Sequence, residues 1–389
     1  MSKANKLASL AVDVNNLSEL ADQVTDIENA IVRANTNAQL INGIADDIEA
    51  LEANSAVIMN DFANISPEAP VLSFRNKIIN GNFDIWQRGT SQTTADYGSA
   101  DRWNCLHKGS TKTASQQAFT VGQTDVPGNP KYYLRHVVSS VAGAGNYCSF
   151  IQQIEGVQTL AGQTATLSFW AKADSNKSIA TEFRQHFGTG GSPSAIVSSI
   201  GVTTHNLTTS WQKFTTTVSI PSISGKTIGS DGNDKLQINF WFDAESNWDS
   251  RNNSLGQQSG TFDIAQVQLE EGSVPTPFEH RPIGTELALC QRYYETCGTD
   301  TLYKDIIQSY SGGSGSFVQG VEFKVQKRAD PTVSIFSKAG TVDNVSYHNN
   351  SLDYPVTSVE ASTYSIRRIG SSTSLLRTVQ YTFTADAEL

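Results

Sequence analysis

Apolar residues recur at alternating steps of three and four along the first sixty residues. The positions are Leu10, Val14, Leu17, Leu20, Val24, Ile27, Ile31, Ile41, Ile44, Ile48, Leu51 and Ile58. This spacing is the heptad pattern of a coiled coil. One helix cannot bury such a stripe against itself, so the pattern predicts that identical helices associate over residues 7–58. A single amphipathic helix docked on the rest of the chain is the alternative interpretation.

The residue types in this stripe favour three strands over two. Ile27, Ile41 and Ile44 occupy d-type positions, where isoleucine shifts the preference from dimers toward trimers. Two three-residue steps, Leu17 to Leu20 and Ile41 to Ile44, insert short breaks in the register. At about 1.5 Å per residue, residues 7–58 would form a stalk roughly 75–80 Å long. We therefore assign residues 1–61 to a coiled-coil stalk.

The pattern changes after residue 61. The sequence Ser66-Pro67-Glu68-Ala69-Pro70 stops a helix and extends the backbone, so residues 62–76 are predicted to form a neck. From residue 77 to 282 the apolar positions alternate, which is typical of half-buried strands. Phe83–Trp86 is expected to begin the first strand. Further strands are predicted at 164–172, 214–220, 236–243 and 262–269, the last with a bulge near Ala265.

These short alternating strands, joined by segments rich in Gly, Asn and Ser, predict a jelly-roll or β-sandwich domain over residues 77–282. Residues 283–299 are predicted to form a helical junction. Residues 300–389 are predicted to form a smaller C-terminal antiparallel β domain, with strands at 302–310, 317–325, 333–336, 342–347, 364–369 and 375–383. The fold class expected is mainly β with an N-terminal α-helical coiled coil.

Charge and cysteine content narrow the functional classes. The formal net charge is −10, and residues 1–62 hold ten acids against three bases, so −7 of it lies in the stalk. No basic field is available for nucleic acid or for an anionic membrane surface. The four cysteines, Cys105, Cys148, Cys290 and Cys297, have neither disulfide-framework nor zinc-site spacing and are predicted to be free thiols. No signal peptide and no membrane-spanning stretch is recognised.

The sequence contains no recognisable catalytic constellation. The six histidines are scattered, and neither a nucleophile elbow, a phosphate-binding loop nor a dinucleotide motif is present. We therefore expect that the protein is not an enzyme. No cofactor is predicted; Asp84 and Asp263 are the oxygen ligands suggested for a structural calcium ion, without the spacing of a known calcium loop.

Binding of a glycan has better support in the sequence. Trp170 and Trp241 fall on strand faces opposite to the apolar ones, and Trp248 lies in a polar loop. Tryptophan rings stack on the apolar face of a sugar, and amides or carboxylates bond its hydroxyl groups. The predicted glycan-binding residues are Trp170, Trp241, Trp248, Asn239, Asp243 and Asp249. The alternative is that these tryptophans cover an outer sheet face beneath a loop or a neighbouring subunit. Trp86, Trp103 and Trp211 are expected in the core.

Several motifs resemble a family of proteins. Residues 76–89 (NKIINGNFDIWQRG), 167–173 (LSFWAKA) and 264–272 (IAQVQLEEG) resemble a domain common in bacteriophage tail-fibre and receptor-binding proteins, itself similar to jelly-roll carbohydrate-binding modules. Residues 278–282 and 286–295 resemble the junction that follows this domain, and residues 323–333 and 383–389 resemble the distal C-terminal domain of such fibres. The resemblance covers residues 76–389.

The resemblance implies a homotrimeric virion fibre, made in the host cytoplasm and anchored at its N-terminus on another virion protein. Its partner would be a bacterial surface polysaccharide or lipopolysaccharide, with no nucleic acid bound and no membrane insertion. Three binding sites on one stalk would raise avidity through effective concentration. Two alternatives stay open: a purely structural fibre, spacer or head-decorating fibre, and a depolymerase, which would normally call for a long repetitive β-helix that the sequence lacks.

Overall fold

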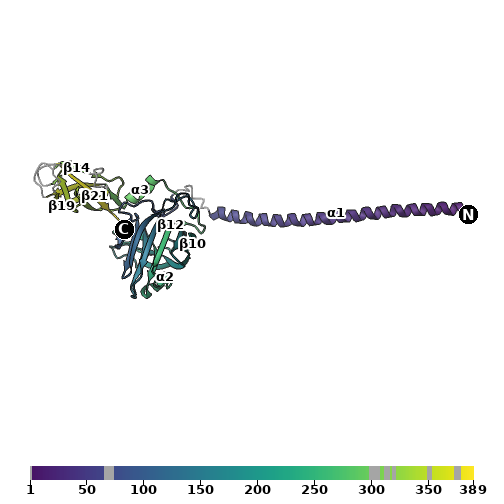
Figure 1. Ribbon diagram of the computed structural model, residues 1–389, viewed down its shortest axis with the longest axis horizontal. Coiled ribbons are helices and arrows are strands. Elements are labelled where there is room, and N and C mark those ends of the chain that lie inside the picture. The colour runs from purple at the N-terminus through teal and green to yellow at the C-terminus, as the bar shows by residue number, and fades with distance from the viewer. Residues whose placement is uncertain are drawn as a thin grey trace. The chain divides into compact units, whose positions relative to one another are not determined.

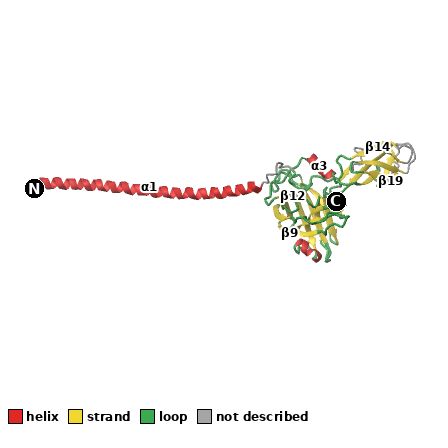
Figure 2. Cartoon of the chain, turned by 180° about the vertical axis from the view of Figure 1, so that it is seen from behind, coloured by secondary structure: helices red, strands yellow, loops and turns green. Residues whose placement is uncertain are grey.

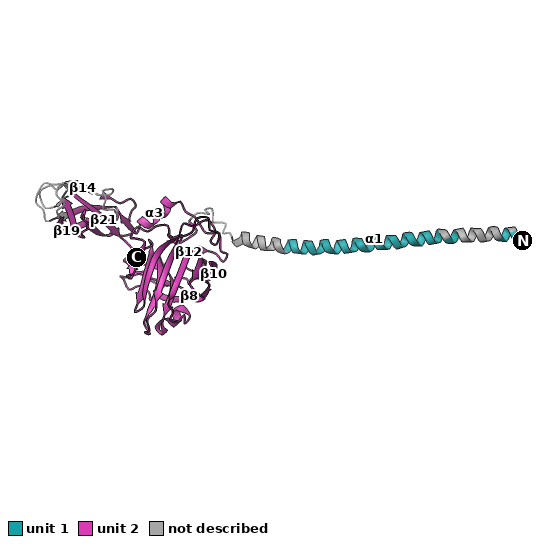
Figure 3. Ribbon diagram, viewed as in Figure 1, with its two compact units in different colours: residues 1–70 teal, residues 71–389 magenta. Residues whose placement is uncertain are grey.

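A computed structural model describes residues 2–64, 74–297, 307–310, 316–317, 321–347, 353–371 and 378–389. The chain divides into two compact units, residues 1–70 and residues 71–389 (Figure 3).

The first unit is a single α-helix, α1 (Lys3–Asn64), drawn as the long ribbon in Figure 1. It continues three residues past the expected end of the stalk. The predicted seam residues from Leu17 to Leu51 are exposed in the single chain, with between 47% and 67% of each side chain accessible. Leu10, Val14 and Ile58 lie where the helix is placed but its side chains are not described. A continuous apolar stripe of this kind stabilises a helix only when a second surface covers it.

Within the described part of the chain, no helix combines the length and apolar character required to span a membrane.

The second unit contains a β-sandwich, whose strands are yellow in Figure 2. Its first sheet has the order β1-β4-β5-β12-β7-β10, and its second has the order β2-β3-β6-β11-β8-β9. All pairings are antiparallel. The bounds in the first sheet are β1 (Ser91–Gln92), β4 (Thr111–Ala118), β5 (Tyr132–Ser139), β12 (Gly260–Glu271), β7 (Thr164–Ala173) and β10 (Gln212–Ser219). Those in the second are β2 (Asp96–Tyr97), β3 (Trp103–Lys108), β6 (Tyr147–Glu155), β11 (Lys235–Ala244), β8 (Lys177–His186) and β9 (Val197–Leu207).

The two sheets bury one continuous apolar core between their inner faces. It draws alternate residues from the central strands: Leu167, Phe169 and Ala171 of β7, Leu236, Ile238, Phe240 and Phe242 of β11, and Phe262, Ile264, Val267 and Leu269 of β12. In β12 the core residues are even-numbered before the bulge and odd-numbered after it, because the register shifts between Ala265 and Gln268. This shift confirms the predicted bulge. The strands predicted from alternation therefore form the centre of the sandwich.

Within the described residues, one predicted strand is wrong. Phe83–Trp86 is a loop, although Phe83 is fully buried in the core. Phe83 has a φ of 56°, and its amide donates to Asn80 O at 3.1 Å. This local turn uses the backbone donor that a strand would have offered to a neighbour. The apolar residues reflect burial here and not extension.

The C-terminal part of this unit begins with α3 (Ile283–Gln291) and continues as a second antiparallel sheet. The main strand order is β13-β21-β18-β19-β20-β15, with β14 and β17 also paired to β21 and β16 paired to β20. The bounds are β13 (Tyr294–Thr296), β14 (Ile307–Tyr310), β15 (Ser316–Phe317), β16 (Val321–Glu322), β17 (Thr332–Phe336), β18 (Asn344–Tyr347), β19 (Asp353–Ala361), β20 (Ser365–Ser371) and β21 (Thr378–Asp386). A mainly β chain with an N-terminal helix, a sandwich and a smaller C-terminal β region is thus confirmed.

Strand β19 has no counterpart among the predicted strands. It contains Pro355, which lies opposite Asn344 in β18, and its register shifts on the β20 side. Proline interrupts the sequence signal of a strand because it cannot donate to the ladder.

Cys105, Cys148 and Cys290 are buried free thiols, as predicted, and Cys297 is half-buried.

Candidate functional site

The tryptophans predicted to bind a glycan lie on opposite outer faces of the sandwich. Trp170 belongs to β7 in the first sheet, between the core residues Phe169 and Ala171. Trp241 belongs to β11 in the second sheet, and Trp248 ends the short 3₁₀ helix η1 (Ser246–Trp248) that follows it. The apolar core separates the two faces, so Trp170 cannot share one site with Trp241 and Trp248 in a single chain.

On the second sheet, Trp241 is buried beneath the segment formed by η1 and α2 (Asp249–Asn252). Only 2% of Trp241 is exposed, and its ring centroid lies 5.6 Å from that of Trp248. The Arg251 guanidinium lies 4.9 Å above the Trp241 ring and forms an ion pair with the buried Glu182 carboxylate, with Nε 2.9 Å from Oε1. The Trp241 Nε1–H donates to Glu182 Oε2 at 3.3 Å. One face of Trp241 is therefore already occupied by an internal cation.

Asp243 is likewise committed to internal hydrogen bonds. Its Oδ2 accepts from the Ser110 hydroxyl at 2.5 Å. Its Oδ1 accepts from the Ser140 hydroxyl at 2.7 Å and from the backbone N–H of Gln258 at 2.8 Å. Only 1% of Asp243 is exposed. The carboxylate ties three loops together, which accounts for a charged group at this depth.

Asn239 is also buried and donates from Nδ2 to Glu182 at 3.3 Å, whereas Asp249 is exposed in the first turn of α2. Trp248 is half-buried and donates from Nε1 to Gly145 O at 3.2 Å. Of the residues predicted on this face, Trp248 and Asp249 are the two that reach the surface. The face otherwise resembles the alternative stated above, in which a loop covers the sheet.

Trp170, in contrast, lines an open pocket of about 290 Å³ on the outer face of the first sheet. Its lining residues are Pro127, Gly128, Ser168, Trp170, Lys213, Gln266, Pro277, Phe278 and His280. Among the described residues, none places an aromatic ring or a cation against Trp170. The volume is at the lower end of the range for small-molecule pockets. The indole ring and the polar groups around it are therefore available to a ligand.

The pocket is assembled from segments that are far apart in the sequence. Lys213 of β10 lies directly opposite Trp170 of β7, and Ala265 of β12 lies opposite it on the other side. Gln266 has a φ of 49° at the bulge, and its Nε2 donates to Pro127 O at 2.7 Å. The bulge thus turns a strand residue outward to hold the loop that forms one wall.

One glycine shapes the opposite wall. A Cβ on Gly128, whose φ is 80°, would lie 2.5 Å from Nε2 of the exposed His280. The His280 ring packs edge-on against Phe278, with centroids 5.1 Å apart. Gly128 therefore allows the loop after β4 to approach the segment that carries Phe278 and His280.

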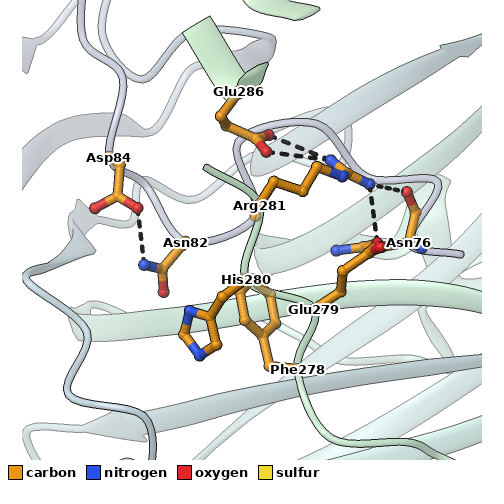
Figure 4. A pocket seen from close by; sticks show the side chains of 9 residues that line it. Asn76, Asn82, Asp84, Phe278, Glu279, His280, Arg281 and Glu286 are labelled. Carbon is orange, nitrogen blue, oxygen red and sulfur yellow. Dashed lines mark hydrogen bonds and ion pairs between the residues drawn. The ribbon is translucent and has the colours of Figure 1, made fainter. Parts of the chain in front are cut away.

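A polar network lies on the far side of Phe278 and His280 (Figure 4). Arg281 pairs with Glu286 at 3.3 Å and with Glu279 at 3.4 Å, and its guanidinium donates to the Asn76 carbonyl. Asn82 Nδ2 donates to Asp84 Oδ2 at 2.8 Å. These paired groups join residues 74–84 to the segment after β12 and so fix the wall of the Trp170 pocket.

Aromatic and basic residues continue along the same outer face beyond the pocket. Lys172 Nζ lies 5.2 Å above the Trp211 ring, and Trp211 clusters with Tyr133 and Phe119 at centroid distances of 5.3 Å. Trp211 is half-buried in this surface cluster and is absent from the core, so its predicted core position is wrong. Trp103 is fully buried and Trp86 packs against the core.

The two aspartates suggested for calcium have other partners. Asp263 forms a bidentate pair with Arg135 at 2.8 and 2.9 Å, and Lys172 lies 3.8 Å away. Asp84 bonds to one amide, and burial raises the pKa of its carboxyl although Asn82 and His280 oppose the shift. No group of three or more metal-ligating side chains occurs among the residues whose side chains are described.

Sequence reasoning identified Trp170 and missed its neighbours. Lys213, Phe278 and His280 carry no local motif for binding, and only the strand order brings β10 and the segment after β12 to Trp170. The one usable signal was the alternation in residues 212–219, which places Lys213 on the face opposite to Phe214.

Comparisons with known proteins find similarity among solved structures. No family model and no curated protein matches the chain. Among solved structures, the enzymatically active domain of bacteriophage CBA120 tailspike protein 4 is similar over 51% of this chain, at 14% identity and a TM-score of 0.28; the match spans about a fifth (21%) of that protein.

Two carbohydrate-binding structures are similar to the same extent. The family 11 module from Clostridium thermocellum, in complex with a β-1,3-1,4-mixed-linked tetrasaccharide, matches 48% of this chain and 98% of its own at 11% identity and a TM-score of 0.28. The N-terminal cellulose-binding domain of a Cellulomonas fimi β-1,4-glucanase matches 49% of this chain and 100% of its own, at 15% identity and a TM-score of 0.28. These values are too low to transfer a function to this chain.

Proposed function

We propose that this chain is a homotrimeric bacteriophage fibre that adsorbs the virion to a glycan on the host surface by non-covalent binding. The observation that carries the proposal is the pocket around Trp170, where a half-buried indole ring lies among hydrogen-bonding side chains. The glycan would belong to a bacterial polysaccharide or lipopolysaccharide, as the tail-fibre resemblance of residues 76–389 suggests.

The pocket chemistry suits a sugar ring. The apolar face of a pyranose would stack on Trp170, while Lys213, Ser168 and His280 offer polar groups at the rim. Ser168 and Gln266 are buried within the sheet, so they are held in place before a ligand arrives. Binding at one such site is weak, and three copies on a common stalk would raise the avidity.

Binding without catalysis is the proposed mode of action. None of the nine described residues that line the pocket is acidic. Glycoside hydrolysis uses a pair of carboxylates that face each other across the bond to be broken. The lining therefore favours recognition over cleavage.

The proposed trimer is supported by the apolar stripe of α1. Nine seam side chains from Leu17 to Leu51 are exposed in the single chain, and a partner helix on this stripe would remove that surface from water. The N-terminal end of α1 would then attach to another virion protein.

A structural fibre is the second candidate. It is favoured by Trp241, Asn239 and Asp243, which were predicted to bind a glycan and instead use their polar groups inside the chain. In that case the Trp170 pocket would be covered by a neighbouring subunit, and Trp170 fluorescence would not respond to sugars.

The test is binding of the purified full-length protein to an array of bacterial surface polysaccharides, beside adsorption of particles that carry or lack the protein. We expect a defined set of glycans to bind, and we expect the particles without the protein to adsorb poorly. Silence of a folded protein on the array, together with normal adsorption of those particles, would refute adsorption and leave the structural role.

A further inference from the structure

The side chains that line the Trp170 pocket are rich in hydrogen-bond donors and contain no anion. Lys213 supplies three donors and no acceptor, and the His280 ring supplies at least one donor. One N–H of Gln266 Nε2 donates to Pro127 O, which leaves the second N–H and the carbonyl oxygen of this amide. Neutral sugars present hydroxyls that both donate and accept, and a carboxylate only accepts.

Lys213 is available to pair with a carboxylate of a ligand. It is exposed and forms no ion pair with any described residue. Because it lies directly opposite Trp170 across the β7–β10 pairing, its side chain leaves the sheet on the same face as the indole. The ammonium group therefore lies at the edge of the surface on which a sugar ring would stack.

The neighbouring charges strengthen this preference. Along the same face, Lys172 and Arg135 share the single carboxylate of Asp263, which is buried between them. With Lys213, these four groups carry a net charge of +2, on a chain whose formal charge is −10. On the other side of His280, Asp84 is bonded to Asn82 and lies in the polar network of Figure 4, which His280 also lines. A basic surface on an acidic protein attracts an anionic ligand.

We infer that the ligand of this pocket is an acidic saccharide, whose ring stacks on Trp170 while its carboxylate, or another anionic substituent, pairs with Lys213. This inference rests on the proposed glycan binding and names its substrate class. Stacking supplies contact area, and the ion pair at the rim selects the charged sugar over its neutral counterpart.

The experiment uses the full-length protein and an array on which each acidic bacterial polysaccharide is printed beside its carboxyl-reduced form and beside neutral polysaccharides. We expect binding to acidic members, with loss of at least tenfold in affinity on carboxyl reduction and weakening as NaCl rises from 50 to 500 mM. Lys213→Gln should reduce affinity roughly three- to tenfold and flatten the salt dependence, and Lys213→Arg should restore both. Lys226→Gln, which removes one exposed charge from the loop between β10 and β11, is the matched control.

The outcomes separate this inference from the proposed function. Equal binding of acidic and reduced forms, or preference for neutral members, would overturn the acidic ligand and leave glycan adsorption standing. Equal losses for the Lys213→Gln and Lys226→Gln variants would assign the effect to net charge and overturn the role of Lys213. Silence of the folded protein on every glycan would refute the proposed function and this inference with it.

Discussion

Trp170 and Lys213 are direct partners in the antiparallel pairing of β7 with β10, and both line the same pocket on the outer face of the first sheet. Direct partners on one face have Cβ atoms only about 5 Å apart. An apolar ring and a cation are thereby held side by side by the backbone ladder. Neither depends on a loop for its position.

The two outer faces can be distinguished by paired substitutions. Trp170→Ala should lower the affinity for a bound glycan roughly tenfold, because it removes the stacking surface. Trp248→Ala, which removes a half-buried indole from the opposite face, should leave the affinity within about twofold. Isothermal titration with a glycan identified on the array measures both. The reverse ranking would move the site to the second sheet.

The stalk prediction concerns mass in solution. Light scattering should give about three chains for the full-length protein, and Ile41→Asp should lower that mass because it would place three carboxylates in the apolar seam. Gln39→Asp adds the same charge two residues away, off the seam, and should leave the mass unchanged.

A chain that begins at Pro70 shows where assembly lies. If it stays trimeric, the β domains carry assembly and α1 is chiefly a spacer. A monomeric full-length protein would contradict the coiled coil outright.

A buried ion cluster joins the sandwich to the C-terminal strand. Glu388 pairs with Arg88 at 3.2 Å and also with Arg102, which is 1% exposed and lies 3.4 Å over the Tyr293 ring. Glu388→Ala leaves buried guanidinium charge without this partner and should cost about 3–5 kcal/mol of unfolding free energy in urea.

The control for this cluster is the exposed pair of Glu360 and Arg368. Glu360→Ala should cost about 0–1 kcal/mol, since exposed pairs are screened by water. A similar small loss at Glu388 would mean that the cluster does not stabilise the fold.

His136 should make the fold sensitive to acid. Its ring is fully buried, 4.7 Å from Phe242 and 4.8 Å from Phe150, and neither ring nitrogen has a described partner. Burial, with the nearby Lys112, lowers the pKa of His136 well below its ordinary value. Burial also lowers the pKa of His205 to about 4.

Because the pKa values of His136 and His205 are lowered in the folded protein, the unfolding free energy depends on pH. Below about pH 6.5 these two histidines bind protons in the unfolded chain but stay neutral in the folded protein. Their contribution to the unfolding free energy is therefore present above that pH and is lost as the pH decreases. Each such histidine contributes a slope of about 1.4 kcal/mol per pH unit. His136→Phe should therefore reduce the loss of unfolding free energy between pH 6 and pH 5 by about that amount. Phe183→Leu, a core change without a titrating group and without a ring contact to either histidine, should cost the same at both pH values. An unchanged slope in His136→Phe would contradict the prediction.

Elements with strong periodicity could be predicted from the amino-acid pattern alone. Steps of three and four gave α1 its apolar stripe, and alternation located β7, β10, β11 and β12, because burial on one face leaves a period of two in the side chains. The bulge in β12 was visible as a slip in that period. Phe83–Trp86 was wrongly predicted as a strand because its apolar residues are buried in a turn. Strand β19 was missed because Pro355 interrupts the pattern that is typical of a strand.

The tertiary structure alone decided which residues share a surface. A period of two places Trp170 and Trp241 outside their strands, but it cannot say that β7 and β11 belong to different sheets. Strand order is set by long-range pairing, and that order brings Lys213, Phe278 and His280 to Trp170 while η1 and α2 close over Trp241. Local pattern determines which way a side chain points relative to its own strand. Its neighbours are determined by contacts between different segments of the chain.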